Sequence, residues 1–298
     1  YGSTEFHVFR KKDDQIDIRF LHYFFQQPSF RHAAAINMTG TAGQKRVPAG
    51  FLARLKIPLP PLEVQKKIAA VLEKADTLRR KREEQIKRLD DLLQATFLDM
   101  FGDPVTNPKG WPVSNLEEIG EITTGSTPPT KEKNMFDGEI PFITPGDLKE
   151  SWVSAARTVT EDGAKKSRTV MKGATLVCCI GATIGKMGKA AEYAAFNQQI
   201  NAISWGSLVE HNFGLEMMKF FKQKIALAGA STTLPILNKG LFKKISIPVP
   251  PLTLQNSFSK IIHSIEIQKK FFLEQLKTSN NLFASLMQRA FKGELELK

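Results

Sequence analysis

Two long segments of the chain repeat their apolar residues at helical spacing. Residues 62–101 and 252–292 contain no Pro or Gly and are dense in Leu, Ile, Lys, Glu and Gln, which favours helix. Apolar residues recur in them at alternating steps of four and three, which is typical of a coiled-coil seam. The predicted pairing residues are Ile68, Leu72, Ile86, Leu89 and Leu93 in the first segment and Phe258, Ile262, Phe272, Leu276 and Phe283 in the second.

Each predicted helix needs a partner for its seam. A helix of about forty residues is roughly 60 Å long at ~1.5 Å per residue, which is too long to be buried in one small domain. The seam alone would equally support a homodimeric coiled coil. Because two matching helices in one chain are tethered at a high effective concentration, an intramolecular antiparallel pair is favoured.

The rest of the chain follows a different pattern of short apolar runs between turns. Residues 140–143, 175–180 and 200–203 are predicted strands, bounded by Gly and Pro. One helix is predicted from Leu215 to Leu227, and Phe6–Phe9 has the pattern of a further strand. Residues 102–251 are therefore expected to form an α+β domain. Since the chain starts with a strand and without Met, we expect it to begin inside a folded unit.

A proline-rich box occurs twice, directly before each long helix. Residues 57–62, Ile-Pro-Leu-Pro-Pro-Leu, recur 190 positions later as Ile-Pro-Val-Pro-Pro-Leu at 247–252, and Gln65 falls on Gln255 in the same register. A single box could be only a stiff exit from a domain before a helix. Its recurrence in register predicts a duplicated architecture.

The charge is basic and unevenly distributed. The chain has 42 Lys+Arg and 30 Asp+Glu, a net charge of +12, which indicates nucleic acid or another anionic partner but is also compatible with a plain solubility charge. Residues 1–61 carry +5, residues 102–251 carry +3 and residues 252–292 carry +4, whereas residues 62–101 carry only +1. The first long helix is therefore better suited to pairing with protein.

Little in the sequence indicates catalysis, a metal site or a membrane. Cys178 and Cys179 are adjacent, so neither a disulfide framework nor a zinc spacing exists, and a reducing compartment is the natural interpretation. The spacing of Asp147 and Lys149 resembles a nuclease triplet, but such triplets arise by chance in charged sequences. Residues 181–186 lack the phosphate-loop spacing, so their glycines are expected to form a turn between strands. No apolar run of eighteen residues and no signal peptide occur, which favours a cytoplasmic protein.

The order of these features carries a family resemblance. A turn-rich domain, an I-P-x-P-P-L-x-x-Q box and a long helix, followed by the same again, resembles the specificity subunit of type I restriction-modification systems. Residues 107–111 (Asn-Pro-Lys-Gly-Trp), 122–128, 140–148, 180–186 and 197–198 fit this family as well. The resemblance implies two target-recognition domains that each read half of a split DNA sequence, and two long helices that pair as a spacer between them.

The resemblance also sets expected boundaries and shows one departure. Residues 1–61 resemble only the C-terminal remnant of a first recognition domain, with Phe20–Phe25 as the counterpart of the helix around Met217–Phe221. Residues 62–101 are the first spacer helix, 102–251 the second recognition domain, 252–292 the second spacer helix and 293–298 a tail. Nothing corresponds to residues 108 to about 195 for the first domain. The first half-site would be unread or supplied by another chain.

DNA contact requires Lys and Arg for phosphates and Asn, Gln, Thr, Ser, Lys or Arg for base edges. Polar loops rich in these residues are the candidates, although an exposed polar loop can also touch nothing. The candidate residues are Gln44, Lys45 and Arg46 before the first proline box, Thr127, Thr130, Lys131, Lys133 and Asn134 after Gly125, then Lys165, Lys166, Arg168 and Lys186, and finally Thr232, Thr233, Asn238 and Lys239 before the second box.

The resulting hypothesis is a DNA-recognition subunit without catalytic residues or a metal of its own. The resemblance implies double-stranded DNA, methyltransferase subunits and possibly a restriction or translocase subunit as partners. S-adenosylmethionine, ATP and Mg²⁺ are expected on those partners, not on this chain. Two alternatives stay open: a coiled-coil scaffold that does not bind DNA, and the recognition end of a fused restriction enzyme.

Overall fold

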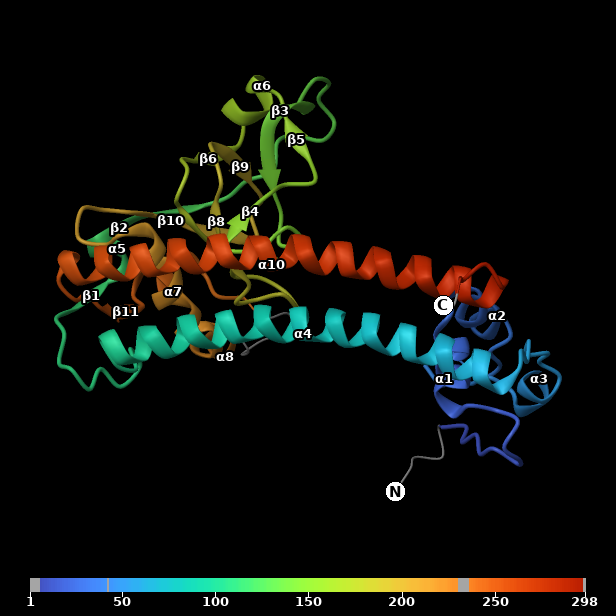
Figure 1. Ribbon diagram of the computed structural model, residues 1–298. Coiled ribbons are helices and arrows are strands. Elements are labelled where there is room, and N and C mark those ends of the chain that lie inside the picture. Colours follow the sequence, from blue (N-terminus) through green and yellow to red (C-terminus); the bar gives the residue numbers. More distant parts are fainter. Residues whose placement is uncertain (1–5, 42, 230–235, 297–298) are drawn as a thin grey trace. The chain divides into compact units, whose positions relative to one another are not determined.

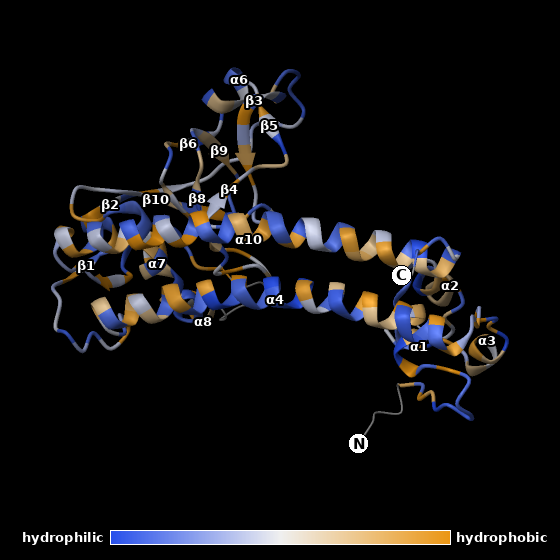
Figure 2. Ribbon diagram, viewed as in Figure 1, coloured by the Kyte–Doolittle hydropathy of each residue, from blue (hydrophilic) through white to orange (hydrophobic). Residues whose placement is uncertain are grey.

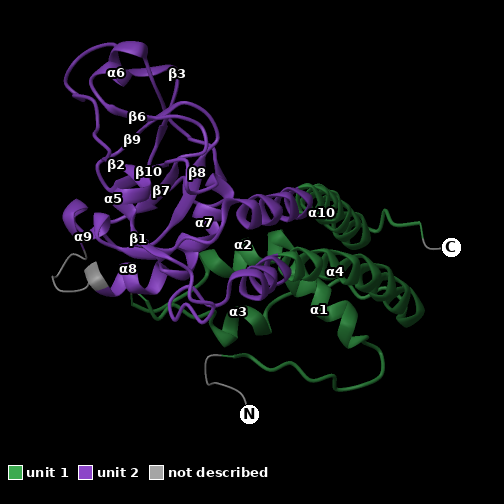
Figure 3. Cartoon of the chain, turned by 90° about the vertical axis from the view of Figure 1, so that its left-hand side faces the viewer, with its two compact units in different colours: residues 1–89, 267–298 green, residues 90–266 purple. Residues whose placement is uncertain are grey.

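The chain forms two compact units, each containing one end of both long helices. The computed structural model describes residues 6–41, 43–229 and 236–296. Unit 1 comprises residues 1–89 and 267–298, and unit 2 comprises residues 90–266 (Figure 3). The long helices are α4 (Leu62–Phe101) and α10 (Leu252–Lys292), and each passes from one unit into the other (Figure 1).

Unit 2 has an α+β fold built on three sheets. The five-stranded sheet has the order β2 (Gly120–Thr124), β10 (Ile200–Trp205), β7 (Thr175–Cys178), β8 (Met187–Ala190), β4 (Trp152–Val153). The four-stranded sheet has the order β5 (Thr158–Val159), β3 (Phe136–Ile143), β9 (Ala194–Phe196), β6 (Arg168–Val170), and β1 (Val113–Asn115) pairs with β11 (Ser246–Pro248). The strands predicted around residues 140–143, 175–180 and 200–203 are confirmed.

The helices of unit 2 are shorter than α10 and line the core. They are α5 (Leu116–Ile119), α6 (Glu161–Lys165), α7 (His211–Phe220), α8 (Lys222–Gly229) and α9 (Lys239–Lys243). The single helix predicted from Leu215 to Leu227 is wrong in its bounds. Phe221, with φ −86° and ψ 2°, separates α7 from α8, and its ring, 2% exposed, packs in the core with Phe213 and Met217.

Unit 1 is helical in its described part. It contains α1 (Ile18–Gln26), α2 (Pro28–Ile36) and α3 (Ala49–Ala53), and its core joins Phe20 and Tyr23 of α1 to Leu72 of α4 and Phe283 of α10. The strand predicted at Phe6–Phe9 is wrong, since these residues are exposed and irregular. A strand requires a neighbour for its backbone N–H and C=O groups, and the described residues of unit 1 place no strand beside them.

The seams of the two long helices face each other in antiparallel fashion within each unit. In unit 1 the Arg79 guanidinium lies 5.0 Å from the Phe283 ring, and that of Arg82, further along α4, lies 5.8 Å from Phe272, earlier in α10. In unit 2 the rings of Phe97 and Phe101 lie 5.5 and 5.3 Å from Phe258. The intramolecular antiparallel pair is therefore confirmed, and Figure 2 shows its alternating apolar and polar residues.

None of the predicted pairing residues is exposed. Six are buried, and the other four are half-buried in the same seam. The buried ones are Ile68, Leu72, Leu89, Phe258, Ile262 and Phe283, and the half-buried ones are Ile86, Leu93, Phe272 and Leu276.

The duplication extends to single hydrogen bonds. The buried Gln255 side chain accepts from the Glu210 N–H (2.9 Å) and donates to the carbonyls of Pro250 (2.8 Å) and Leu208 (3.0 Å). The buried Gln65 repeats this pattern in unit 1, accepting from the N–H of Asp17 (3.0 Å) and donating to the carbonyls at positions 60 (2.8 Å) and 15 (3.0 Å).

These equivalent contacts also identify α1 and α7 as counterparts in the duplication. Asp17 caps the N-terminus of α1, and Glu210 caps that of α7. The predicted correspondence between α1 and the helix around Met217 therefore holds, but its register shifts by about one turn. When the two capping residues are matched, Phe20 corresponds to Phe213, and each is buried in the core of its own unit.

Candidate nucleic-acid interface

Three loops of unit 2 meet at one end of its sheets and carry polar side chains. We call residues 125–134, 181–186 and 197–199 the loop cluster. The Ser126 N–H donates to the Phe196 carbonyl (3.0 Å), and the Thr127 hydroxyl donates to the side-chain oxygen of Gln198 (2.5 Å). The Cys179 N–H donates to the carbonyl of Gln199, the last residue of the third loop (2.8 Å). Thr127 is therefore held against Gln198, and both this side chain and that of the adjacent Gln199 have the donors and acceptors that base edges require.

Glycines allow the loops to approach this closely. A Cβ on Gly125 would lie 2.2 Å from the Asn197 carbonyl oxygen, so only glycine fits there. Gly181 and Gly185 have φ of +86° and +83°, and the Gly185 N–H donates to the Cys178 carbonyl (2.8 Å). The loop at 181–186 thus reverses the chain between β7 and β8, which pair antiparallel, as predicted. It leaves Lys186 half-buried at the start of β8.

The cluster at Lys165, Lys166 and Arg168 adjoins the first loop. The Ser167 hydroxyl donates to the Ser126 carbonyl, and Lys166 forms an ion pair with Glu132 of that loop. Lys165 pairs with Asp162 at 3.2 Å. Two of the three positive charges therefore already have a carboxylate partner. The remaining candidates of this loop are all exposed: Thr130, Lys131, Lys133 and Asn134.

A basic surface lies on α8 and α9, and the sequence analysis predicted only Lys239 of it. Residues 211–251 contain six basic residues and one acidic residue, so the modest charge of residues 102–251 hides a concentration of lysine. Ion pairs join Lys219 to Glu216 (2.7 Å) and Lys243 to Glu117 (3.5 Å). The other four, without a carboxylate partner in the described part of the chain, are Lys222, Lys224, Lys239 and Lys244. A charge count over shorter windows would have found them.

The basic surface borders the loop cluster. Gly185 lies against Lys222, since a Cβ there would be 3.0 Å from the Lys222 Cγ. Ile180 forms a β-bridge with Ile236, two residues before Asn238. Asn238 is exposed, but its side-chain oxygen caps α9 by accepting from the Leu241 N–H (2.9 Å).

The remaining candidates lie elsewhere. Gln44, Lys45 and Arg46 are exposed in unit 1, where Arg46 bridges Thr39. Thr232 and Thr233 fall outside the described residues.

The described residues contain no group of side chains placed to bind a metal ion. Across residues 6–41, 43–229 and 236–296, no group of three or more His, Cys, Asp or Glu side chains is placed to hold a metal ion. Asp147 closes a turn by accepting hydrogen bonds from the Thr144 N–H (2.8 Å) and hydroxyl (2.7 Å), so its carboxylate has a structural role in this turn. Burial raises the pKa of Cys179 to about 12, so its thiol stays protonated. In the described part of the chain no helix is long and apolar enough to cross a membrane.

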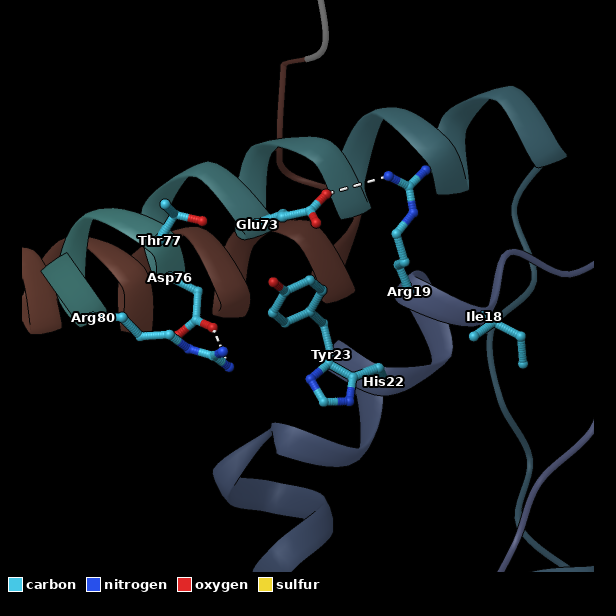
Figure 4. A pocket seen from close by; sticks show the side chains of 8 residues that line it. All are labelled: Ile18, Arg19, His22, Tyr23, Glu73, Asp76, Thr77 and Arg80. Carbon is cyan, nitrogen blue, oxygen red and sulfur yellow. Dashed lines mark hydrogen bonds and ion pairs between the residues drawn. The ribbon is translucent and has the colours of Figure 1, made fainter.

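One cavity of unit 1 gathers charged side chains (Figure 4). It has a volume of about 350 Å³ and lies between α1 and α4. Ion pairs join Arg19 to Glu73 (3.2 Å) and Arg80 to Asp76 (2.8 Å), and burial, then the charges of Asp76 and Glu73, raise the pKa of Tyr23. The charged side chains drawn together here thus neutralise one another.

Comparison with known sequences gives one consistent result. The family described as "Type I restriction modification DNA specificity domain" matches residues 1–88 and 108–280. The MjaIX specificity subunit of a type I restriction enzyme from Methanocaldococcus jannaschii is 28% identical over 193 residues, which cover 62% of this chain and 44% of that protein. The putative MjaX specificity subunit of the same organism is 25% identical over 93% of this chain and 67% of its own length. The chain thus spans less than half of the first relative.

Solved structures share the fold. The HsdS subunit from Thermoanaerobacter tengcongensis matches with a TM-score of 0.51 and 21% identity over 93% of this chain and 70% of that chain. A chain from a structure of complex assembly and conformational transition of the type I R-M system matches with a TM-score of 0.60 and 22% identity, over 93% and 71%.

Proposed function

The chain belongs to the type I restriction-modification DNA specificity family, and from this premise we propose that it reads part of a bipartite DNA target for a type I restriction-modification complex. In this proposal unit 2 is the recognition module. Its loop cluster contacts base edges, and its basic surface contacts the phosphates. The two long helices act as the spacer.

The observation that carries the proposal is the combination of two surfaces in unit 2. Thr127, Gln198 and Gln199 supply side chains suited to base edges, and Lys222 borders the same loops with a charge that no carboxylate in the described residues neutralises. Phosphate contacts supply most of the affinity of DNA-binding proteins, and base contacts supply their specificity. A scaffold that assembles only proteins would not need both next to each other.

We further propose that the chemistry belongs to partner subunits. DNA methyltransferase subunits would bind S-adenosylmethionine, and a restriction or translocase subunit, where present, would use ATP and Mg²⁺. The seams of α4 and α10 are occupied by each other, so partners would dock on the outer faces of these helices or on the units.

Fluorescence anisotropy on labelled random duplexes, over a series of salt concentrations, tests the proposal. We expect salt-dependent binding, measured with the methyltransferase subunits of the same system present and absent. If neither preparation binds DNA in a salt-dependent way, the recognition function is refuted and the scaffold alternative is favoured.

Two matched sets of variants locate the phosphate contacts. Replacing Lys222 and Lys224 by Gln should lower the slope of log affinity against log salt by about 1.8, if each lysine neutralises one phosphate. The corresponding Gln variants of Lys165 and Lys166 should change the slope less, because their charges already pair with Asp162 and Glu132. Equal slopes for both sets would show that Lys222 and Lys224 lie away from the DNA.

A further inference from the structure

A buried lysine connects the strands of unit 2 to the long helix α10. Lys189, on β8, is 1% exposed. Its ammonium group lies 4.0 Å from the centre of the Trp152 ring, donates to the side-chain oxygen of Asn212 on α7, and lies 3.9 Å from Oε1 of Glu266 on α10. A buried charge is costly unless it is paired and hydrogen-bonded, so the ammonium group of Lys189 requires these partners around it.

The partners of Lys189 are themselves joined. Trp152, opposite Lys189 in the parallel pair of β4 and β8, donates its indole N–H to Oε2 of Glu266 (3.3 Å). The Asn212 amide donates to the Ser259 hydroxyl of α10 (2.7 Å). We call Lys189, Trp152 and Glu266 the joint. It ties the edge of the five-stranded sheet to one face of the spacer helix.

The duplicated half of the chain satisfies the equivalent acid in a different way. The position equivalent to Glu266 is Asp76, 190 residues earlier. Its carboxylate, 5% exposed, is neutralised by Arg79 (2.6 Å) and Arg80 (2.8 Å) of its own helix. The same acid is thus satisfied within α4 in unit 1 and by a residue of the sheet in unit 2. In unit 2 the contacts of Glu266 with Lys189 and Trp152 therefore join α10 to strands β8 and β4.

The joint is close in sequence to the loop cluster. Lys189 follows Lys186 by three residues, and both lie on the stretch that leaves the turn at 181–186. A displacement of β8 on α10 would therefore move the loops that face DNA. In a bipartite target, one base pair more or less between half-sites shifts the second half-site by about 3.4 Å and rotates it around the helix axis.

We propose that the joint of Lys189, Trp152 and Glu266 fixes the orientation of the recognition loops on α10 and thereby determines which spacing between half-sites the complex accepts. The three are positioning residues, since they act through the loops and do not touch DNA. The inference rests on the proposed function and adds to it the residues that control spacing.

The test maps modified positions in the DNA of cells that express the complex with its methyltransferase subunits. Glu266→Gln is the deciding variant, because its side chain is 28% exposed and Gln keeps an acceptor for the Trp152 N–H while removing the charge opposite Lys189. Lys189→Met is the stronger variant. We expect the wild type to modify a motif of one spacing. We compare modification at sites whose half-sites are one base pair closer or further apart with modification at sites of the original spacing. For Glu266→Gln, the ratio of the first to the second should be at least tenfold higher than for the wild type.

Lys66→Met is the control. It removes the ion pair of Lys66 with Glu63 (2.8 Å), which lies within α4 of unit 1 and involves neither α10 nor the strands, so its motif and spacing should stay those of the wild type. A merely structural role would lower the amount of folded complex and leave the spacing unchanged.

The outcomes separate the two proposals. If the wild-type complex modifies no specific sequence, the proposed function fails. If the wild type has a specific motif and Glu266→Gln modifies it with the same spacing ratio, the joint has no positioning role and the inference alone is overturned. A wild-type motif without a gap between two specified blocks would overturn it as well.

Discussion

Replacing Gln255 by Leu tests whether one buried side chain joins the start of α10 to the rest of unit 2. Gln255 is 0% exposed and bonds three backbone groups, the carbonyls of Pro250 and Leu208 and the N–H of Glu210. Leu has a similar volume, so no large cavity is created. The substitution removes the hydrogen bonds and leaves the packing.

The expected loss follows from what happens to each backbone group. The Leu208 residue is 57% exposed, so its carbonyl can turn to water. Pro250 is buried and Glu210 is half-buried, so their groups lose a partner without replacement. An unsatisfied buried group costs about 1–3 kcal/mol, which gives about 2–6 kcal/mol for the two groups together.

Urea unfolding followed by far-UV circular dichroism measures this loss, and the duplication supplies a matched variant. Gln65 makes the same three bonds, but its partners at positions 15, 17 and 60 are exposed or half-buried. We expect Gln65→Leu to lose less free energy of unfolding than Gln255→Leu. A loss below about 1 kcal/mol for Gln255→Leu, or a larger loss for Gln65→Leu, would refute the reasoning, because unsatisfied backbone groups are its only source.

Three further predictions concern unit 2. Phe97→Ala should lower the free energy of unfolding by about 3–5 kcal/mol, since this ring, 1% exposed, packs against Phe101 and Phe258; a smaller loss in urea unfolding would mean that the core collapses around it. Gly125→Ala should displace the loop cluster and weaken binding in anisotropy more than it lowers the melting temperature, because its Cβ would collide with the Asn197 carbonyl; the reverse order would argue against a role in recognition. Burial lowers the pKa of Lys189 below 10.5, so the unfolded chain holds this proton more tightly and stability should rise as pH rises from the lowered pKa toward 10.5. Lys189→Met should abolish that rise in urea unfolding, and an unchanged pH profile would contradict it.

Several features of the fold could be predicted because their cause is local. The absence of Pro and Gly and the steps of three and four predict α4 and α10, and the seam residues are buried or half-buried as expected. The proline boxes and the paired Gln65 and Gln255 predict the duplication, because the same sequence before the same helix forms the same hydrogen bonds.

Part of the candidate interface was also predictable, and part was not. Thr127 and Lys186 lie in loops that the sequence marks by glycine and polar residues. The ion pair of Lys166 with Glu132 could not be predicted, since it joins residues 34 positions apart and depends on how α6 meets the first loop. The excess of lysine in residues 211–251 can be counted in the sequence, but only the structure shows which of these lysines pair with a carboxylate.

The sequence by itself determined the long helices, the duplication and the family resemblance, because propensity and periodicity are properties of neighbouring residues. It favoured the pairing of the helices within one chain, which the contacts of Phe283 and Phe258 then established. The tertiary structure decided whether Phe6–Phe9 has a strand partner, where the helix at Phe221 ends, and which acid faces Lys189. Lys189 sits in a short apolar strand and meets Glu266 77 residues later. Such contacts depend on the packing of distant segments, and local sequence carries no direct signal of them.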